Sequence, residues 1–381
     1  MINSSVFTLK FLATHIFRPK HIQHRRITII MAPSNPALMY KKVPSGLPVP
    51  GQDLAIEDVQ PAPSEAPKDG LLLQVLYSSV DPYLRGLLRD SSIKSYFPAF
   101  KTGEPLKSGA IAKVLSSSAQ GFSEGNLVQG MLPIQRYVAV PSDAVKGIQK
   151  LDADENDKSL DLRHYLGALG MPGLTAYSSF YEIGKPKRGE TIFVSSAAGA
   201  VGQIVGQLAK HEGLTVIGSV GSDEKLKYIT EELHFDLGFN YKKEGPHDAL
   251  KRLAPNGIDI YFENVGADHL DAAIENLNTF GRIIACGMIA EYNAKSEEER
   301  YAHKNLMKIV GKQLTMRGFL VHGDPSCGPK HQKDHVENVT KWLKDGSFTA
   351  KTHEWDISEG DKGFVGMLKG ENLGKALLKV S

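Results

Sequence analysis

The stretch that most constrains this sequence runs from Glu190 to Lys210 and reads ETIFVSSAAGAVGQIVGQLAK. Thr191 to Ser195 form an apolar, partly β-branched run of the kind that fills a parallel strand. The pattern Ser196-x-x-Gly199-x-x-Gly202 follows, and a helix is predicted after it. Such a strand, glycine turn and helix let a pyrophosphate reach free backbone amides at a helix N-terminus. A small-residue helix packed closely on a strand fits the same residues, but the second strand expected at 214–220 favours dinucleotide binding.

Strands and helices alternate after Gly170, which predicts a parallel, doubly wound sheet. The six expected strands are Thr191 to Ser195, Leu214 to Ser219, Phe235 to Asn240, Ile258 to Glu263, Arg282 to Gly287 and Leu314 to Phe319. The expected helices are Ala200 to Glu212, Asp223 to Leu233, Asp248 to Leu253, His269 to Asn278 and Tyr301 to Val310. Six strands with crossovers are enough for a complete dinucleotide-binding domain of the Rossmann type.

The residues before Gly170 show a different pattern. Short β candidates separated by Gly and Ser turns predict a compact β-rich domain, and they are Leu54 to Val59, Leu71 to Tyr77, Ala110 to Leu115 and Tyr137 to Val140. The charged stretch 150–164 is expected to be a solvated connection. In the tail, His353 to Ile357 and Ala376 to Val380 are strand-like, have no expected helical partner, and could pair back onto the first domain.

Composition excludes several classes of protein. The 381 residues carry 45 basic and 43 acidic side chains, a net charge of +2 that gives no reason to expect nucleic-acid binding. No apolar run approaches the roughly 20 residues that span a bilayer, so no membrane partner is expected. The two cysteines, Cys286 and Cys327, are too few for a disulfide framework and fit a reducing compartment.

The first 31 residues differ from the rest because they contain basic side chains and no acidic one. A basic segment with scattered aromatic residues can be a mitochondrial transit peptide. The alternative is a disordered extension ahead of a second start at Met31, which we favour because Pro19 interrupts an amphipathic helix. We therefore expect a cytoplasmic protein, with a mitochondrial location as the alternative.

Cofactor choice depends on the end of the second strand. An NAD site places an acidic residue about 20 positions after the glycine turn. Asp223 is near that position, but it also suits the first turn of the next helix, where the helix dipole favours a carboxylate. Lys225 and the phenol of Tyr241 could instead surround a 2′-phosphate. These residues alone favour NADP only slightly.

Polar residues also end the later strands, where ligands of parallel sheets bind. Asn264 follows one strand and could touch the cofactor or cap the next helix. Cys286 ends the following strand, and Tyr292 comes shortly after it. The phenol of Tyr292 could lie beside a nicotinamide or simply pack at the surface.

Several catalytic motifs are missing or misplaced. No cysteine cluster or His/Cys triad provides a zinc site, so no metal is expected. The string Gly121-Phe122-Ser123-Glu124-Gly125 matches a nucleophile elbow but lies between β candidates, where a polar turn is expected. Tyr181 and Lys185 have the spacing of the short-chain dehydrogenase pair, yet they precede the glycine turn instead of following it. The remaining chemistry is hydride transfer by a bound cofactor.

Seven short motifs in order resemble one family over residues 32–381. They are Val80-Asp81-Pro82-Tyr83-Leu84-Arg85-Gly86, Gly170-Met171-Pro172-Gly173-Leu174-Thr175-Ala176-Tyr177, Ala197-Ala198-Gly199-Ala200-Val201-Gly202-Gln203, Gly221-Ser222-Asp223-Glu224-Lys225, Phe239-Asn240-Tyr241-Lys242, Phe262-Glu263-Asn264-Val265-Gly266 and Glu371-Asn372-Leu373-Gly374-Lys375. The chain resembles the zinc-independent medium-chain dehydrogenase/reductases, in particular the group of leukotriene B4 12-hydroxydehydrogenase, prostaglandin reductase and alkenal double-bond reductase.

The resemblance implies an α/β fold with a Rossmann domain and a GroES-like catalytic domain. The expected division is a basic extension at 1–31, the GroES-like domain at 32–163, the Rossmann domain at 164–347 and a C-terminal segment at 348–381 that completes the catalytic domain. NADPH is the implied cofactor, with Lys225 and Tyr241 holding its 2′-phosphate. A homodimer is common in the family.

The remaining site residues also come from the resemblance. The expected cofactor-binding residues are Met171, Thr175, Gly199, Ala200, Val201, Gly202, Lys225, Tyr241, Asn264, Cys286, Tyr292, Phe319, Val321 and Asn372. Tyr292, beside the nicotinamide ribose, and Tyr83, facing the substrate, are the expected catalytic residues. Glu291 places a carboxylate where a neutral polar residue is usual, which is expected to change the charge preference for substrates.

The implied activity is NADPH-dependent reduction of the C=C bond of α,β-unsaturated carbonyl compounds. Tyr292 and the cofactor ribose would stabilise the enolate oxygen. The alternatives are quinone reduction or oxidation of a hydroxylated lipid, and a non-catalytic NADPH-binding protein, since fold does not fix function.

Overall fold

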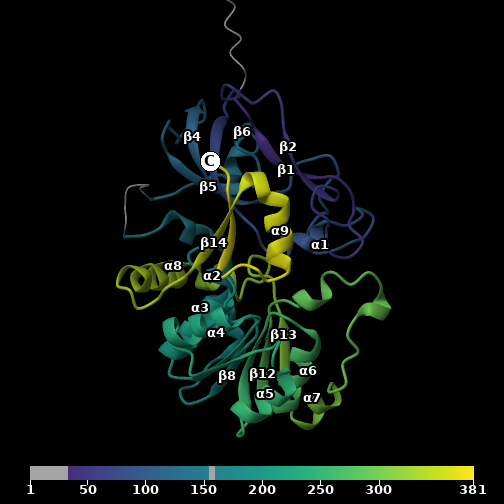
Figure 1. The fold of residues 1–381 in the computed structure, drawn as a ribbon. Coiled ribbons are helices and arrows are strands. Elements are labelled where there is room, and N and C mark those ends of the chain that lie inside the picture. Colours follow the sequence, from purple (N-terminus) through teal and green to yellow (C-terminus); the bar gives the residue numbers. More distant parts are fainter. Residues whose placement is uncertain (1–32, 154–158) are drawn as a thin grey trace, which may run out of the picture. The chain divides into compact units, whose positions relative to one another are not determined.

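The computed structural model describes residues 33–153 and 159–381, and residues 34–381 form one compact unit. The predictions made for the first 31 residues lie outside the described part. Three sheets organise the unit, two in a β-rich part and one in an α/β part. Figure 1 shows the β-rich part at the top and the α/β part below. Within the described residues, no helix is long and apolar enough to cross a membrane.

The β-rich part contains a two-stranded and a seven-stranded sheet. The small sheet pairs β1 (Pro36–Tyr40) with β2 (Leu54–Asp58). The larger one has the order β14-β15-β3-β4-β5-β7, with β6 also paired to β3. Its strands are β3 (Leu71–Ser79), β4 (Lys107–Ser117), β5 (Leu127–Pro133), β6 (Tyr137–Val140), β7 (Gln149–Lys150), β14 (Thr352–Asp356) and β15 (Lys375–Lys379). All four β candidates of this region are confirmed, whereas β1, β5 and β7 were not predicted.

The α/β part is built on a six-stranded parallel sheet of order β10-β9-β8-β11-β12-β13. Its strands are β8 (Thr191–Val194), β9 (Thr215–Val220), β10 (Leu237–Asn240), β11 (Ile258–Glu263), β12 (Leu277–Ala285) and β13 (Thr315–Gly318). These are the six predicted strands, although β12 begins five residues earlier than expected. β8 lies between β9 and β11, and its apolar residues are buried there. The strand order reverses at β8, so its carboxyl end opens into the crevice where ligands of such sheets bind.

Helices cover the parallel sheet and connect its strands. They are α2 (Met171–Ser179), α3 (Gly202–His211), α4 (Asp223–Lys227), α5 (Pro246–Leu253), α6 (Ala267–Asn276), α7 (Met307–Gly311) and α8 (Gly328–Lys344); α1 (Leu84–Leu87) lies in the β-rich part. A π-helical turn at Tyr228–Glu232 extends α4 to nearly its predicted length. The sequence did not predict α1, α2 or α8.

One predicted helix is mostly wrong. Residues 301–306 are not helical, and α7 begins only at Met307. The buried carboxylate of Asp271 accepts hydrogen bonds from the backbone amides of Lys304 and Asn305 and from the Tyr301 hydroxyl. These bonds hold the segment in a non-helical conformation that its own sequence does not encode.

The tail returns to the β-rich part, as Figure 1 shows in yellow. β14 pairs in parallel with β15, and β15 pairs antiparallel with β3. The expectation that the tail strands have no helical partner is wrong, because α9 (Gly360–Leu368) connects them and buries Phe364 and Met367. Its apolar face packs into the same core as β3 and β4, so the last 30 residues are part of the β-rich core.

Candidate functional site

Gly202 and Gly206 leave no room for a side chain where α3 follows the turn after β8. A Cβ on Gly202 would lie 2.4 Å from the carbonyl oxygen of Ser196, and one on Gly206 would lie 1.9 Å from Cζ of Phe235. Ser196 itself has a φ of 50°, a strained value for a residue with a side chain. The glycines therefore allow the turn and the helix to approach the sheet closely.

The same turn leaves backbone donors available. Within the described part of the chain, no group accepts a hydrogen bond from the amides of Val201 or Gly202. These two amides are consecutive and lie at the start of a ten-residue helix, where the helix dipole also favours an anion. The turn thus fits a pyrophosphate, and the predicted residues at 199–202 all lie in it.

Two alternatives were predicted for the residues that contact the cofactor ribose after β9. They are Asp223, for a 2′-hydroxyl, and Lys225 with Tyr241, for a 2′-phosphate. Asp223 accepts hydrogen bonds from Nδ2 of Asn240 at 3.0 Å and from Nζ of Lys243 at 2.5 Å. Its carboxylate is therefore engaged locally, within the first turn of α4, as expected for the helix position. This arrangement weakens the case for a carboxylate that binds a ribose hydroxyl.

Lys225 and Tyr241 approach the end of β9 from α4 and β10. The side chain of Ser222 caps α4 by accepting a hydrogen bond from the Lys225 amide at 3.2 Å. A Cβ on Gly221 would lie 2.9 Å from the Tyr241 hydroxyl, so the phenol covers this glycine. Burial lowers the pKa of Lys225, and the nearby Lys242 acts in the same direction. A cation held in this partly buried place would be stabilised by a phosphate.

Asn264 is fixed by a buried polar network at the end of β11. Its amide nitrogen donates to the carbonyl oxygen of Ser195 at 2.8 Å, and its backbone N–H donates to Oγ of the same serine at 2.9 Å. Glu263 accepts from the backbone amides of Val265 and Gly266 at 2.6 and 2.8 Å. Burial raises the pKa of Glu263, while those two amides oppose the shift. The network leaves the carbonyl oxygen of the Asn264 side chain available to a ligand.

The end of β12 carries Cys286 and, after a short loop, Tyr292. A Cβ on Gly287 would lie 3.1 Å from the Tyr292 hydroxyl, which places the phenol against the strand end. Burial raises the pKa of Tyr292 to about 12, with the Met288 backbone acting in the opposite direction. The phenol is therefore a hydrogen-bond donor at neutral pH. Burial also raises the pKa of the Cys286 thiol to about 12, so this side chain is a poor nucleophile.

The remaining predicted cofactor residues lie on three further elements. Met171 and Thr175 are one turn apart on α2, and the Thr175 hydroxyl lies 3.5 Å from the Met171 sulfur. Phe319 and Val321 follow β13, and the carbonyl oxygen of Val321 accepts from the Gly328 amide at 3.0 Å.

Asn372 belongs to the tail and is tied to the glycine turn. Its side-chain amide donates to the carbonyl oxygen of Gly374 at 2.7 Å, and the Gly374 amide donates to Ala198 at 2.9 Å. Gly374 and Gly199 form a parallel bridge. The tail of the β-rich part thus contacts the turn of the α/β part directly.

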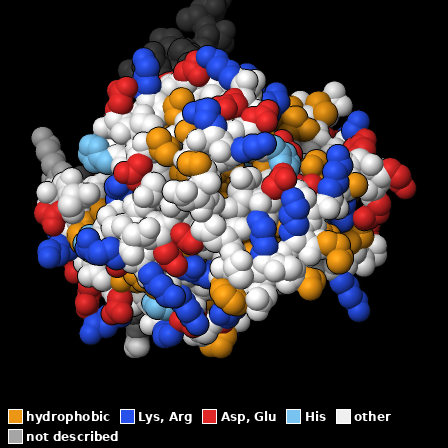
Figure 2. Space-filling model, turned by 90° about the horizontal axis from the view of Figure 1, so that it is seen from below, with side chains coloured by type: hydrophobic (Ala, Val, Ile, Leu, Met, Phe, Trp, Pro, Cys, Tyr) orange, Lys and Arg blue, Asp and Glu red, His pale blue; other side chains and the backbone are white. Residues whose placement is uncertain are grey.

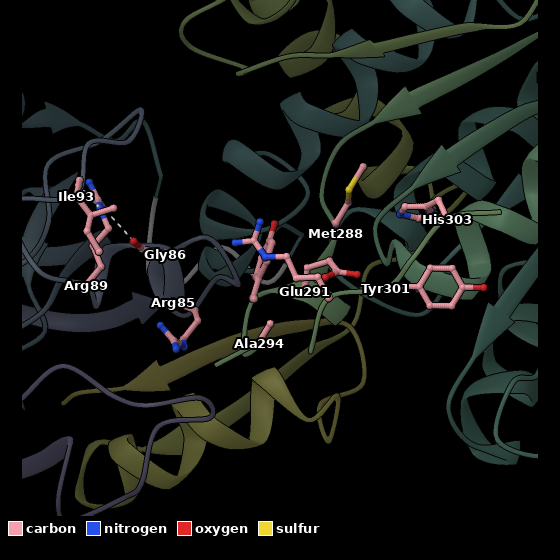
Figure 3. Close-up of a pocket in the computed structure, with 11 residues that line it drawn as sticks. Arg85, Gly86, Arg89, Ile93, Met288, Glu291, Ala294, Tyr301 and His303 are labelled. Atoms are coloured by element: carbon pink, nitrogen blue, oxygen red, sulfur yellow. Dashed lines mark hydrogen bonds between the residues drawn. The ribbon is translucent and has the colours of Figure 1, made fainter. Parts of the chain in front are cut away.

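A cavity of about 650 Å³ lies between α1 and the segment after β12 (Figure 3). This volume suits a small organic ligand. Its lining residues are Arg85, Gly86, Arg89, Ile93, Met288, Glu291, Tyr292, Ala294, Arg300, Tyr301 and His303. Among the residues predicted for the site, Tyr292 is the one that lines it, so this phenol is available to a molecule bound there.

Tyr83 lies just before α1 and is not among the lining residues. Its ring packs on Phe97, with the ring centres 6.1 Å apart. Burial, and then the nearby Asp81 carboxylate, raise the pKa of Tyr83, so the phenol keeps its proton. Its predicted contact with a substrate remains a prediction.

Two arginines that sequence reasoning missed shape this cavity. Arg85 is buried and donates to Asn293, Leu88 and Gly46, while Arg89 donates to three backbone carbonyls of its own loop. Both side chains therefore fix loops through neutral acceptors. The one indication in the sequence was their position, because Arg85 lies within the motif Val80 to Gly86 and Arg89 follows it closely.

Comparison with known proteins identifies the family. One family model, described as zinc-binding dehydrogenase, matches residues 200–341, and another, the N-terminal domain of oxidoreductase, matches 37–148. The chain is 46% identical to the NADP-dependent oxidoreductase RED1 of Cochliobolus heterostrophus, an alignment that covers 91% of this chain and 98% of that protein. The chain belongs to the medium-chain dehydrogenase/reductase family.

Other members extend the comparison. This medium-chain dehydrogenase/reductase is 41% identical to a 2-alkenal reductase (NADP(+)-dependent) of Nicotiana tabacum over 82% of this chain and 87% of that one. It is also similar to the crystal structure of CurA in complex with NADPH from Vibrio vulnificus, with a TM-score of 0.81, 31% identity, and coverage of 91% and 99% of the two chains. The predicted family and two-part α/β fold are therefore confirmed. Among the described residues, no group of three or more His, Cys, Asp or Glu side chains is placed to hold a metal.

Proposed function

We propose that this protein is an NADPH-dependent reductase of the C=C bond of α,β-unsaturated carbonyl compounds. The observation that carries the proposal is the protonated phenol of Tyr292, which lies against the end of β12 and lines the 650 Å³ cavity. A donor at this place can stabilise negative charge on a carbonyl oxygen. The similarity to a 2-alkenal reductase supports the same reaction class.

The residues of the glycine turn would hold the cofactor. The free amides of Val201 and Gly202 would bind its pyrophosphate, and Lys225 with Tyr241 would bind the 2′-phosphate that distinguishes NADPH from NADH. Asn264, Cys286 and Asn372 would line the path between them, with Met171, Thr175, Phe319 and Val321 around the nicotinamide. When bound, NADPH supplies a hydride to the β-carbon of the conjugated carbonyl.

The protein's own side chains would stabilise the charge that this addition creates. As electron density moves to the carbonyl oxygen, the Tyr292 hydroxyl donates a hydrogen bond to it. A proton from solvent then reaches the α-carbon, so the compound gains two hydrogen atoms in total. Tyr83, on the other side of the predicted substrate position, would help to orient the compound. No metal ion is part of this scheme.

Turnover tests the proposal directly. NADPH consumption is measured with enals, enones, quinones and secondary alcohols, the last with NADP⁺, and the products are analysed for the position of reduction. We expect saturated carbonyl products, rates that a metal chelator does not change, and a preference for NADPH over NADH. Reduction of quinones alone would replace the proposal by a quinone reductase, and tight NADPH binding without turnover of any compound would contradict catalysis.

We also propose a homodimer formed through the free edge of β13. This strand ends the parallel sheet, and exposed apolar side chains surround it, namely Phe280, Leu306, Met307, Val310 and Met316. Figure 2 shows that hydrophobic patches and charges of both signs share the lower face of the molecule. An unpaired strand edge beside apolar surface is a natural site for a second copy.

The oligomeric state tests this second proposal. Light scattering after gel filtration should give twice the mass of one chain, and Met316→Lys should shift the protein towards the monomer. A wild-type monomer would contradict it. The cytoplasmic location remains a proposal that fractionation of cells can check.

A further inference from the structure

A fully buried ion pair within the β-rich part joins two segments that lead to the candidate site. Lys375, the first residue of β15, is 1% exposed, and Asp81, just after β3, is 6% exposed. The ammonium lies 3.2 Å from Oδ1 of Asp81 and donates to the carbonyl oxygens of Val80 at 2.9 Å and Ala376 at 2.6 Å. The lysine thus has an acceptor for each of its three protons.

Asp81 is attached to the loop that leads to the substrate side of the site. Its second carboxylate oxygen accepts from the Ser79 hydroxyl, and its backbone carbonyl accepts from the Leu84 amide at 3.1 Å, at the start of α1. Tyr83 is two residues further along the chain. The orientation of Asp81 therefore sets where Tyr83 and α1 leave the sheet.

Lys375 is attached to the cofactor side of the site. Gly374, the residue before it, donates its amide to Ala198 and bridges Gly199 in the glycine turn. This connection is rigid, because Gly374 has a φ of 76° and a Cβ there would lie 2.0 Å from the carbonyl oxygen of Lys351. Any shift of the glycine turn would be passed to Lys375 and from there to Asp81.

Strand pairing alone does not explain why this pair is charged. β15 and β3 already pair through their backbones, and the Val80 amide donates to Ala376 at 3.1 Å. Burying two charges is expensive, and apolar replacements of similar volume often serve stability as well or better. The hydrogen bonds of a charged pair fix the orientation of the two side chains as well as the distance between them. An apolar contact does not fix the orientation.

We propose that Asp81 and Lys375 are positioning residues that hold the loop of Tyr83 in register with the cofactor turn. This inference rests on the proposed function, because Tyr83 is assigned to the substrate side there. The pair does not line the cavity, so it acts through the loop and not by touching the substrate.

A double-mutant cycle separates positioning from stability. Asp81→Asn and Lys375→Met each leave one buried charge unpaired, and both single variants should melt at lower temperature than the wild type. The double variant contains neither charge, so its melting temperature should recover most of the loss. Its kcat with the best enone should nevertheless stay at least about tenfold below the wild type, while its Kd for NADPH stays within about twofold.

The pair formed by Glu190 and Arg282 provides the matched control. It is also largely buried, with 2.6 Å between the charged groups, but it is not at the cavity. Glu190 directly precedes β8, and Arg282 lies within β12, level with the second residue of β8. Glu190→Gln with Arg282→Met should change the melting temperature without lowering kcat. Recovery of kcat together with stability in the Asp81/Lys375 double variant would overturn the inference.

Hydrogen–deuterium exchange gives a reading that does not depend on turnover. In the wild type, NADPH should slow exchange both in the glycine turn and in the amides of residues 84–88, whereas in the double variant only the turn should be protected. Equal protection of both segments in the double variant would contradict the coupling. If the wild type reduces no enone but shows this difference, the proposed function fails and the positioning role stands.

Discussion

The ammonium of Lys225 lies 2.6 Å from the carbonyl oxygen of Gly370 and donates a hydrogen bond to it. Lys225 belongs to α4, and Gly370 begins the turn that carries Asn372, so the bond joins two segments 145 residues apart. Both are expected to contact the same cofactor. The lysine is therefore already held at the site before it meets a phosphate, which reduces the side-chain entropy lost on binding.

Lys225→Ala should weaken NADPH more than NADH by about tenfold or more. The variant removes a cation that interacts with the 2′-phosphate alone, and tenfold corresponds to about 1.4 kcal/mol. Fluorescence titration with both nucleotides measures the two Kd values. Lys227→Ala, an exposed lysine of the same helix, is the control and should leave the ratio unchanged. Equal weakening of both nucleotides by Lys225→Ala would remove the lysine from the phosphate site.

Tyr292→Phe should lower kcat by about tenfold or more with little change in the Kd for NADPH, because it removes a donor needed as charge develops. Because the pKa of Tyr292 is raised to about 12, the phenol stays protonated up to about pH 10. The wild-type kcat should therefore show no loss from ionisation of this group between about pH 6 and about pH 10.

Tyr181→Phe is the matched control for that experiment. Its hydroxyl donates to Glu212 at 2.8 Å, away from the cavity, so its removal should leave kcat unchanged. A wild-type rate in Tyr292→Phe would assign stabilisation of the oxygen to water or to the ribose.

The sequence predicted the central strands β8, β9 and β11 well because each is a mainly apolar run followed by glycine or polar residues. Their boundaries coincide with burial, and β11 has the same limits in prediction and structure. The glycine turn was predictable for the same reason, since its small residues are required by close backbone contacts.

The elements that the sequence did not reveal depend on tertiary contacts. α8 buries only Gly328, His335 and Val339 of its 17 residues, so its apolar face is too thin to recognise. The cavity was not predictable either, because its walls come from loops at 85–93 and 288–303 whose courses are set by Arg85, Arg89 and Asp271. The site residues at the strand ends could be predicted from the neighbouring sequence, whereas the residues that line the cavity could not.

Gly206→Ala should destabilise the fold by about 3 kcal/mol, at the upper end of the usual cost of overpacking. The new methyl group would lie 1.9 Å from Cζ of Phe235, which is itself buried against the sheet. α3 must then move away, so the affinity for NADPH should fall as well. Urea unfolding measures the first effect and fluorescence titration the second. Gly311→Ala, where a methyl group meets nothing within 4 Å, should stay within about 0.5 kcal/mol of the wild type; equal effects at both positions would contradict the packing argument.

His335 should make the fold less stable in mild acid. It ties α8 to the segment before α2 by donating from Nε2 to the carbonyl oxygen of Ala168 at 2.8 Å, and its ring lies next to that of Tyr177 in α2. Burial lowers its pKa to about 4, below the ordinary value of 6.5 that applies in the unfolded chain. The folded state therefore favours the neutral ring. The resulting stability is fully present above about pH 6.5 and is lost as the pH falls towards 4.

The full difference corresponds to about 3 kcal/mol, of which about 2 kcal/mol should be lost between about pH 7 and about pH 5. His335→Gln keeps an N–H donor but does not titrate, so its free energy of unfolding should fall by about 2 kcal/mol less than that of the wild type over this range. Urea unfolding at both pH values measures this difference, with the exposed His322→Gln as the control that should follow the wild type. If His335→Gln lost as much stability as the wild type on acidification, another group would be responsible, because the substitution removes the one proton-binding site that this prediction invokes.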